Sequence, residues 1–506
     1  MIRTAMTENG AVRGLPAADP RITSFKGIPF AQPPVGQNRW RAPQPCDDWE
    51  GIRDCFEFAP ISVQDTPGIG DDIYCREWHV DPGIPMDEDC LYLNIWTNAK
   101  DAGERLPVLV WYFGGAFQWG YTAEMEFDGE RLARRGIVVV TVNYRLGALG
   151  FLAHPQLSKE QPEAPCNFGA LDQQAGLRWV KRNIAAFGGD PDNITIAGQS
   201  AGGGSVMAQM ACADNKGYFN KASVFSGMFR SPYIVNDFFI PFSLKDAEKL
   251  GEKLFEELGV TTLEEARKLD AQFIRKTYSN MRDRTGVMFA VVNDGLFCKG
   301  DPQKAFYNGT RNRVPVFAGN TGDEFLDYIQ ADDDAAFAEK AKEFFGDKAQ
   351  TFLAFPEAKR TPQGYAPVSP CEMGVKSAFR FENRLPDSKD CYYYRFVPDI
   401  PGDDDPGTFH SCDLWFFFET IAKCTRPYEG RHYDIARQMC DYWANFIKTG
   451  DPNGTDINGN VLPKWKTYTE ESGFEMEFTP KGAVPAKESS EYTEFLLRKI
   501  MEREQS

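Results

Sequence analysis

The sequence lacks the long apolar segments that define membrane and secreted proteins. Its 506 residues contain no apolar run near the roughly 20 residues that a membrane-spanning helix needs, and residues 136–144 are among the longest. Residues 1–13 are polar and carry Glu8 and Arg13, so no export signal is visible there. We therefore expect a soluble, cytoplasmic protein with no membrane partner.

Positive charge is scarce relative to negative charge. Lys and Arg number 56 against 73 Asp and Glu, which leaves a formal net charge of -17 at pH 7. This sign is wrong for neutralising phosphates or for lying on an anionic membrane surface. We therefore expect no nucleic-acid partner, and nothing in the composition predicts an oligomeric state.

Paired cysteines and metal-ligand spacings are also missing. The 12 cysteines are scattered from Cys46 to Cys440, without C-x-x-C pairs or histidines at zinc spacing. We expect reduced, mostly buried thiols rather than a disulfide framework, and neither a metal nor a cofactor.

What is present is an ordinary globular composition with many aromatic residues, 13% of the chain including 39 Phe. Such a fraction favours a core or a cleft lined with rings. Short β-branched apolar runs alternate with helical patterns such as residues 173–187, which predicts a largely parallel sheet with helices on both faces, an α/β fold. The predicted strands are residues 108–113, 137–143, 194–197, 222–226, 314–318 and 391–397.

The second half of the chain changes character. Residues 244–282 and 332–355 are charged and amphipathic, and we interpret them as helical insertions packed on the sheet, within roughly 235–300 and 332–390. No repeat or low-complexity linker interrupts the sequence. Residues 1–506 are therefore expected to form a single domain.

A candidate nucleophile lies in the pentad G-x-S-x-G formed by Gly198, Ser200 and Gly202. A serine at the tip of a tight strand-to-helix turn projects its hydroxyl above the sheet, and glycines two residues away let strand and helix pass closely. The pentad alone is a weak signal. Its position after a strand and before a helix running through residue 210 favours a nucleophile over a glycine-rich turn with a solvated serine.

A serine nucleophile needs a histidine base, and the sequence has only 4 His. The base follows the serine in chain order in this type of site, which excludes His79 and His154. His410 follows an acidic, glycine-rich stretch that could carry a mobile base. His432 begins a helical pattern and is interpreted as a surface or capping residue.

The acid and the oxyanion donors come from two further strand ends. Asp323 and Glu324 both follow the strand at 314–318, and the residues alone do not decide between them. Gly115 and Ala116 directly follow the strand at 108–113, where their N–H groups could bind an oxyanion together with that of Ala201. Gly114-Gly115 could equally be a plain strand-ending turn.

Further segments occur along nearly the whole chain in a recognisable order. They are Gly27-Ile-Pro-Phe-Ala, Pro33-Pro-Val-Gly, Arg39-Trp40, Glu88-Asp-Cys-Leu-Tyr-Leu-Asn-Ile, Asn143-Tyr-Arg-Leu-Gly, Gly150-Phe-Leu, Asp172-Gln, Asn183-Ile and Phe187-Gly-Gly-Asp-Pro. With these segments the chain resembles the type B carboxylesterase family, the cholinesterase-like branch of the α/β-hydrolases.

The resemblance implies an α/β-hydrolase fold with Ser200 as nucleophile, His410 as general base and Glu324, rather than Asp323, as the acid. It also implies two structural ion pairs outside the chemistry, Arg39 with Glu88 and Arg145 with Asp172.

Four positions depart from the family pattern. Gln199 is neutral where the family usually has Glu, which removes an attraction for choline-like cations. Ala116 replaces a glycine and adds a methyl close to the acyl carbonyl, so bulky tertiary-alcohol esters should fit less well. Phe325 follows the acid where Gly is common. Cys90 matches a cysteine that secreted relatives bridge to an upstream cysteine, and Ser62 stands at the position of that partner. The missing partner indicates an intracellular, bacterial-type member.

These features predict a serine carboxylic-ester hydrolase that forms an acyl-enzyme on apolar or aromatic small-molecule esters, with hydroxycinnamoyl (feruloyl-type) esters as one natural class. The rings expected to line its pocket are Phe117, Trp119, Trp415, Phe416 and Phe417. The alternative is a non-catalytic, cholinesterase-like adhesion or binding protein, because some family members have lost the serine. The presence of Ser200, Glu324 and His410 favours the enzyme.

Overall fold

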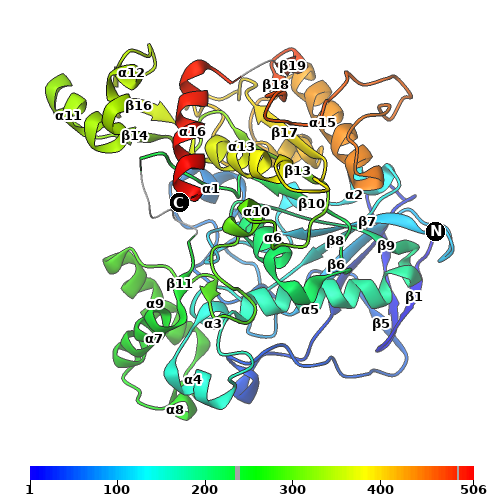
Figure 1. Ribbon diagram of the computed structural model, residues 1–506. Coiled ribbons are helices and arrows are strands. Elements are labelled where there is room, and N and C mark those ends of the chain that lie inside the picture. The colour runs from blue at the N-terminus through cyan, green and yellow to red at the C-terminus, as the bar shows by residue number, and fades with distance from the viewer. Residues whose placement is uncertain (234–239, 487–488, 506) are drawn as a thin grey trace.

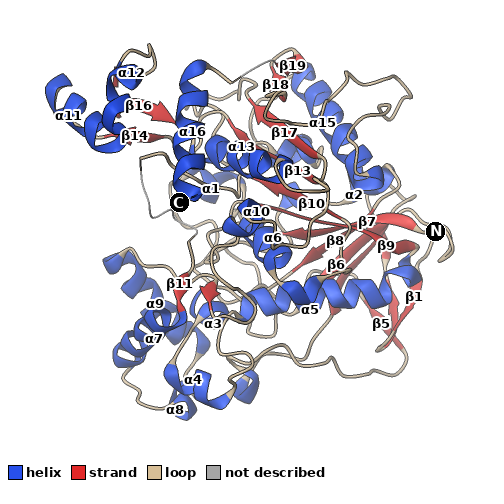
Figure 2. Ribbon diagram, viewed as in Figure 1, coloured by secondary structure: helices blue, strands red, loops and turns tan. Residues whose placement is uncertain are grey.

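A computed structural model describes residues 1–233, 240–486 and 489–505. One sheet of eleven strands runs through the molecule, with helices packed around it (Figures 1 and 2). In spatial order its strands are β19 (Gly482–Ala486), β18 (Glu475–Thr479), β17 (Cys391–Phe396), β13 (Val316–Thr321), β10 (Lys221–Phe225), β9 (Gly189–Gln199), β7 (Leu106–Tyr112), β8 (Val138–Val142), β6 (Tyr92–Thr97), β4 (Thr23–Pro29) and β3 (Leu15–Pro16).

The centre of this sheet is parallel and its two edges are antiparallel. Neighbouring strands from β18 to β8 run parallel, whereas β19, β6, β4 and β3 pair antiparallel with their neighbours. The predicted mostly parallel α/β sheet is therefore confirmed.

Strand β7 shows why the central strands read as continuous apolar runs. Its residues alternate between two hydrophobic clusters, with Val108, Val110 and Tyr112 in one and Leu109 and Trp111 in the other. Each face of the sheet is covered, so neither face needs polar side chains. All six predicted strands coincide with strands of this sheet; the apolar runs missed the antiparallel strands β19, β6, β4 and β3, and also β18, which pairs parallel with β17.

Helices α5 (Phe168–Asn183) and α6 (Ala201–Ala211) flank the sheet next to β9 (Figure 1). The helix predicted at 173–187 begins five residues earlier and tightens into a 3-10 turn at Ile184–Phe187. Gly188 follows at φ 79°, the left-handed conformation in which a glycine commonly ends a helix.

The insertions are only partly as predicted. Residues 244–282 carry helices as expected, namely α7 (Leu244–Leu258), α8 (Leu263–Arg267) and α9 (Ala271–Thr285); residues 234–239 of the same insertion lie outside the described residues.

The second insertion differs from the prediction in two respects. Besides helices α11 (Asp334–Phe345), α12 (Ala349–Leu353) and α13 (Pro370–Asn383) it contains strands β15 (Arg360–Thr361) and β16 (Gly364–Val368), which form a small sheet with β14 (Asp327–Ile329), a strand that precedes the insertion. The interpretation that α11 and α12 pack on the central sheet is wrong. Their aromatic residues form a separate hydrophobic cluster with β16 and α16 (Glu491–Gln505).

All 12 cysteines lie within the described residues, and each is free. Nine are buried, as expected from their scattered positions, and Cys90 is among them. Within the described ranges, none of the helices is long and apolar enough to span a bilayer.

Candidate active site

Ser200 occupies a strained turn between β9 and α6. Its backbone has φ 56° and ψ −125°, a conformation that residues with side chains avoid. A Cβ on Gly198 would lie 2.3 Å from the carbonyl oxygen of Gly202, and a Cβ on Gly202 would lie 2.1 Å from that of Tyr112. Both positions therefore require glycine, which confirms the close strand–helix passage predicted from the pentad.

Three backbone N–H groups near this turn are without hydrogen-bond acceptors in the described part of the chain. They belong to Gly115, Ala116 and Ala201. The loop after β7 lies against the serine, because a Cβ on Gly114 would be 3.2 Å from the Cβ of Ser200. Unengaged N–H donors beside a nucleophile form the arrangement that stabilises an oxyanion.

The backbone of this loop is itself unusual. Gly115 has φ 99°, and Ala116 and Phe117 follow at φ 52° and 63°. Positive φ at two consecutive side-chain-bearing residues is strained. The carbonyl of Gly115 stabilises the turn by accepting from the N–H groups of Gln118 and Trp119.

His410 lies directly against Glu324. Its Nδ1 contacts Oε2 of the carboxylate, and both side chains are buried. The other carboxylate oxygen of Glu324 accepts from the hydroxyl of Ser226 at 2.7 Å and from the N–H of Thr321 at 3.0 Å. A carboxylate held on Nδ1 places the imidazole proton there and leaves Nε2 as the acceptor.

The structure distinguishes between the two adjacent acids. Asp323 accepts through Oδ2 from the N–H and the hydroxyl of Thr408, at 2.8 and 2.7 Å. It therefore ties the loop that carries Glu324 to the loop that carries His410. Glu324, and not Asp323, contacts the imidazole.

Gln199 contacts the opposite edge of the imidazole. Its Nε2 lies 3.1 Å from Nε2 of His410, and its side chain is buried. The Ser200 hydroxyl, by contrast, has no hydrogen-bond partner among the described residues. The amide of Gln199 thus occupies the ring nitrogen that a serine hydroxyl would use.

A cavity of about 200 Å³ adjoins the loop that follows β7. Ala116 and Phe117 of the β7 loop form part of its wall. Apolar side chains from α6 and the loop after α9 complete much of the lining, namely Met207, Ala208, Val287, Met288 and Val291. The buried ion pair of Arg230 with Asp301 lies at the same cavity.

The other rings expected in the pocket lie elsewhere. Trp119 donates through Nε1 to Asp65 at 3.1 Å, and the guanidinium of Arg282 lies 4.8 Å above its ring. Three further rings are fully buried in the hydrophobic core and not in the pocket wall: Trp415, Phe416 and Phe417. Their prediction as pocket residues is wrong because helix α14 (Leu414–Phe417) turns inward after His410, and Phe417 stacks on Phe225 at 4.6 Å.

The remaining histidines have structural partners. His79 contacts Glu124 at 3.0 Å, and His154 caps helix α4 (Pro155–Glu160). His432 is fully buried and accepts through Nδ1 from the N–H of Glu429, which caps α15 (Gly430–Thr449). Of the two roles predicted for His432, surface or capping, the structure shows the capping one, and the surface one is wrong.

Both ion pairs implied by the family resemblance are present. Arg39 contacts Glu88 at 2.6 Å, and Arg145 contacts Asp172 at 2.7 Å. Arg145 and Asp172 are almost entirely buried, as structural pairs should be.

Two residues that contact the site were not predicted from the sequence. Ser226, which holds Glu324, is only the last residue of a predicted strand and carries no motif of its own. The hydroxyl of Tyr74 donates to the carbonyl of His410 at 3.2 Å across 336 positions of sequence. No local pattern signals a contact between segments so far apart.

Asp413, three residues after His410, is a fully buried acid. Its Oδ2 accepts from the Tyr394 hydroxyl at 2.7 Å, and burial raises the pKa of its carboxyl from 3.8 to about 7. The folded state therefore favours the protonated acid, and stability is lost as pH rises between these two values. Asp413→Asn should be more stable than the wild type at pH 8, by on the order of 2–4 kcal/mol, with little difference at pH 4.

Urea unfolding at the two pH values measures this difference. Asp332→Asn, which changes an exposed carboxylate, is the matched control and should show no such pH dependence. An Asp413→Asn effect that is the same at both pH values would contradict the assignment.

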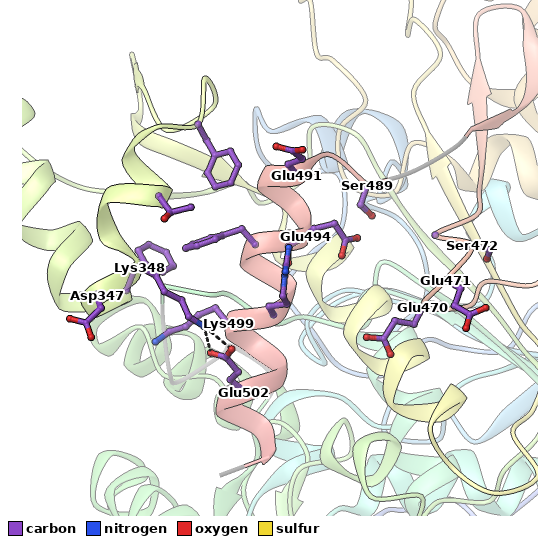
Figure 3. Close-up of a pocket in the computed structure, with 16 residues that line it drawn as sticks. Asp347, Lys348, Glu470, Glu471, Ser472, Ser489, Glu491, Glu494, Lys499 and Glu502 are labelled. Carbon is purple, nitrogen blue, oxygen red and sulfur yellow. Dashed lines mark hydrogen bonds and ion pairs between the residues drawn. The ribbon is translucent and has the colours of Figure 1, made fainter.

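A second hollow, of about 850 Å³, lies away from Ser200, between α12, α16 and residues 470–473 (Figure 3). Some of its charged side chains form ion pairs, as Lys348 does with Glu502 at 2.7 Å. Its described lining contains no histidine held by a carboxylate and none of the three N–H groups of Gly115, Ala116 and Ala201. Within the described residues, no group of three or more His, Cys, Asp or Glu side chains is arranged to hold a metal ion.

Comparison with known proteins gives concordant results. The sequence profile of the "Carboxylesterase family" matches residues 2–380 and 371–496. The chain is 30% identical to the para-nitrobenzyl esterase of Bacillus subtilis over 485 residues, covering 92% of each chain. It is 30% identical to the cocaine esterase of Homo sapiens over 513 residues, covering 94% of this chain and 87% of that one. A solved structure of a PNB esterase matches it with a TM-score of 0.77 at 26% identity, covering 98% and 100% of the two chains.

Proposed function

Because the chain belongs to the carboxylesterase family and has the α/β-hydrolase fold, we propose that it hydrolyses carboxylic esters through a triad of Ser200, His410 and Glu324. The observation that carries this proposal is the His410–Glu324 contact beside the strained Ser200 turn. A strained serine and a carboxylate-held histidine have no common purpose in folding, whereas nucleophilic catalysis needs both.

The reaction follows from the geometry. Ser200 Oγ attacks the ester carbonyl carbon while Nε2 of His410 takes the hydroxyl proton, and Glu324 stabilises the imidazolium. The N–H groups of Gly115, Ala116 and Ala201 bind the tetrahedral oxyanion. When the bond to the alcohol oxygen breaks, His410 returns the proton to the leaving alcohol. Water then attacks the acyl-enzyme with His410 as base again and releases the acid.

During this reaction Gln199 and Ser200 must use the same atom of the imidazole, Nε2 of His410. Its amide gives up Nε2 of His410 when the Ser200 hydroxyl takes that position. Because Gln199 is neutral, it offers a cationic alcohol group no Coulombic attraction. We therefore propose neutral esters, and not choline esters, as substrates.

The substrate class follows from the cavity. Its mostly aliphatic lining and its volume of about 200 Å³ suit a small or medium apolar acyl group, or an aromatic one such as a hydroxycinnamoyl group. Ala116 lines the same cavity, and its methyl group, where a glycine would leave space, disfavours bulky groups at the carbonyl.

The remaining proposals concern the setting of the enzyme. We infer a cytoplasmic location from the 12 free thiols and from Ser62 opposite Cys90, since an exported relative would gain from a disulfide there. We also infer that residues 1–506 act as one catalytic unit, because residues as distant as Ser200 and His410 build one site.

Pre-steady-state hydrolysis of p-nitrophenyl butyrate tests the proposal. The expected result is a burst of p-nitrophenol close to one equivalent per chain, followed by slower turnover, as an acyl-enzyme requires. Prior treatment with a fluorophosphonate should abolish both phases. An absence of turnover and of any covalent adduct would instead favour the non-catalytic binding protein.

A further inference from the structure

Phe325, the residue after Glu324, has a backbone and an exposure that folding does not favour. Its φ is 46°, in the left-handed region that a glycine adopts freely and a phenylalanine avoids. Its side chain is 53% exposed, so about half of the ring gains nothing from burial in the core. Neither unfavourable feature is offset by core packing.

The ring of Phe325 does make one specific contact. Its centroid lies 4.3 Å from that of the His410 imidazole, with the planes at 49°. It also lies 5.9 Å from the ring of Phe229, whose N–H donates to Gln303 at 3.0 Å. Gln303 lines the 200 Å³ cavity together with Ala116. Phe325 therefore contacts the proposed base on one side and Phe229, a neighbour of the cavity wall, on the other.

The chemistry of ester cleavage divides the site into two sides. The carbonyl oxygen must lie at the N–H groups of Gly115 and Ala116, and because Ala116 also lines the 200 Å³ cavity, we assign that cavity to the acyl group. The alcohol oxygen must receive its proton from His410, so the alcohol group leaves beside the imidazole. An exposed ring packed on the imidazole therefore faces the alcohol side.

We propose that Phe325 is a specificity-determining residue, whose exposed face stacks on a planar aromatic group in the alcohol part of the ester. This inference rests on the proposed esterase function and narrows its substrate class to esters of aromatic alcohols. The strained backbone holds the ring in place before substrate arrives, so no ordering is needed on binding.

Paired substrates test this role. Benzyl acetate and cyclohexylmethyl acetate differ in the planarity of the alcohol group, and methyl phenylacetate and methyl cyclohexylacetate differ in the acyl group. Because stacking of two aromatic rings contributes about three- to tenfold, the ratio of kcat/KM for the benzyl to the cyclohexylmethyl ester should fall by that factor in Phe325→Ala and Phe325→Gly. The acyl-side ratio should stay unchanged.

Two further variants and a stability measurement exclude a structural explanation. Phe325→Tyr keeps a ring and should keep the benzyl preference. Phe273→Ala removes a comparably exposed ring on α9 and should leave the ratio as in the wild type. Phe325→Gly relieves the positive φ, so its melting temperature should be no lower than that of the wild type.

The opposite results overturn the proposal. An unchanged benzyl preference in Phe325→Gly contradicts it, as does a loss confined to the acyl-side pair. An equal loss on all four esters with a lower melting temperature would make Phe325 merely structural. Fluorophosphonate labelling separates these outcomes from failure of the esterase function: an unlabelled wild type contradicts both proposals, whereas a labelled one with no change in preference contradicts only the role of Phe325.

Discussion

Ser200→Ala should lower kcat for p-nitrophenyl butyrate by about 10³- to 10⁶-fold without unfolding the protein, because it removes the group that forms the acyl-enzyme. The hydroxyl of Ser200 has no hydrogen-bond partner among the described residues, so its loss leaves no buried group unsatisfied. The melting temperature should therefore change little. Steady-state kinetics and a thermal melt of the same preparation measure both quantities.

Ser205, on the helix that follows Ser200, provides the matched control. Its hydroxyl donates to the carbonyl of Ala201 at 2.9 Å and accepts from Gln173 at 2.8 Å. Ser205→Ala should therefore lower stability by about 1 kcal/mol and leave the burst intact. If Ser205→Ala lost the burst and Ser200→Ala kept it, the nucleophile would have been assigned to the wrong residue.

His410→Ala should lower kcat by about 10³- to 10⁵-fold, and Glu324→Gln by about 10²- to 10⁴-fold. The second effect is smaller because the amide keeps a contact to Nδ1 but does not stabilise the imidazolium. In both variants fluorophosphonate should react with Ser200 far more slowly than in the wild type.

His432→Ala is the control for the base. His432 caps α15 through the N–H of Glu429, so its loss should reduce stability while kcat stays within a few-fold of the wild type. Full activity of His410→Ala together with inactivity of His432→Ala would contradict the proposed base. Full activity of Glu324→Gln would contradict the assignment of Glu324 as the acid of the triad.

The parts of the fold that could be predicted are those with a strong local cause. β7 reads as one apolar run because its alternate residues enter two cores. Gly198 and Gly202 could be predicted because each faces a backbone carbonyl closer than any Cβ allows. In both cases the constraint appears in the local sequence, as a continuous apolar run or as glycines two residues either side of a serine.

The features that could not be predicted depend on which way a side chain points and not on which residue type is present. Asp323 and Glu324 are adjacent and both acidic, yet one binds Thr408 and the other His410. Phe416 and Phe417 follow His410 closely in sequence, but a short helix turns them into the core. Sequence proximity to a site residue does not determine which way a side chain points.

The contact between Gln199 and His410 shows the same limit. From the sequence, the neutral Gln199 before the proposed nucleophile predicts only that the site loses an attraction for choline-like cations. The structure shows a nearer effect, because the amide lies 3.1 Å from the ring nitrogen that the serine needs. Only the fold brings positions 199 and 410 together.

The central claim is that Ser200 is the nucleophile, and mass spectrometry of the fluorophosphonate-treated protein tests it most directly. We predict one adduct per chain, located on Ser200 by peptide mapping, and none in Ser200→Ala. An adduct on another residue, or equal labelling of wild type and Ser200→Ala, would contradict the account.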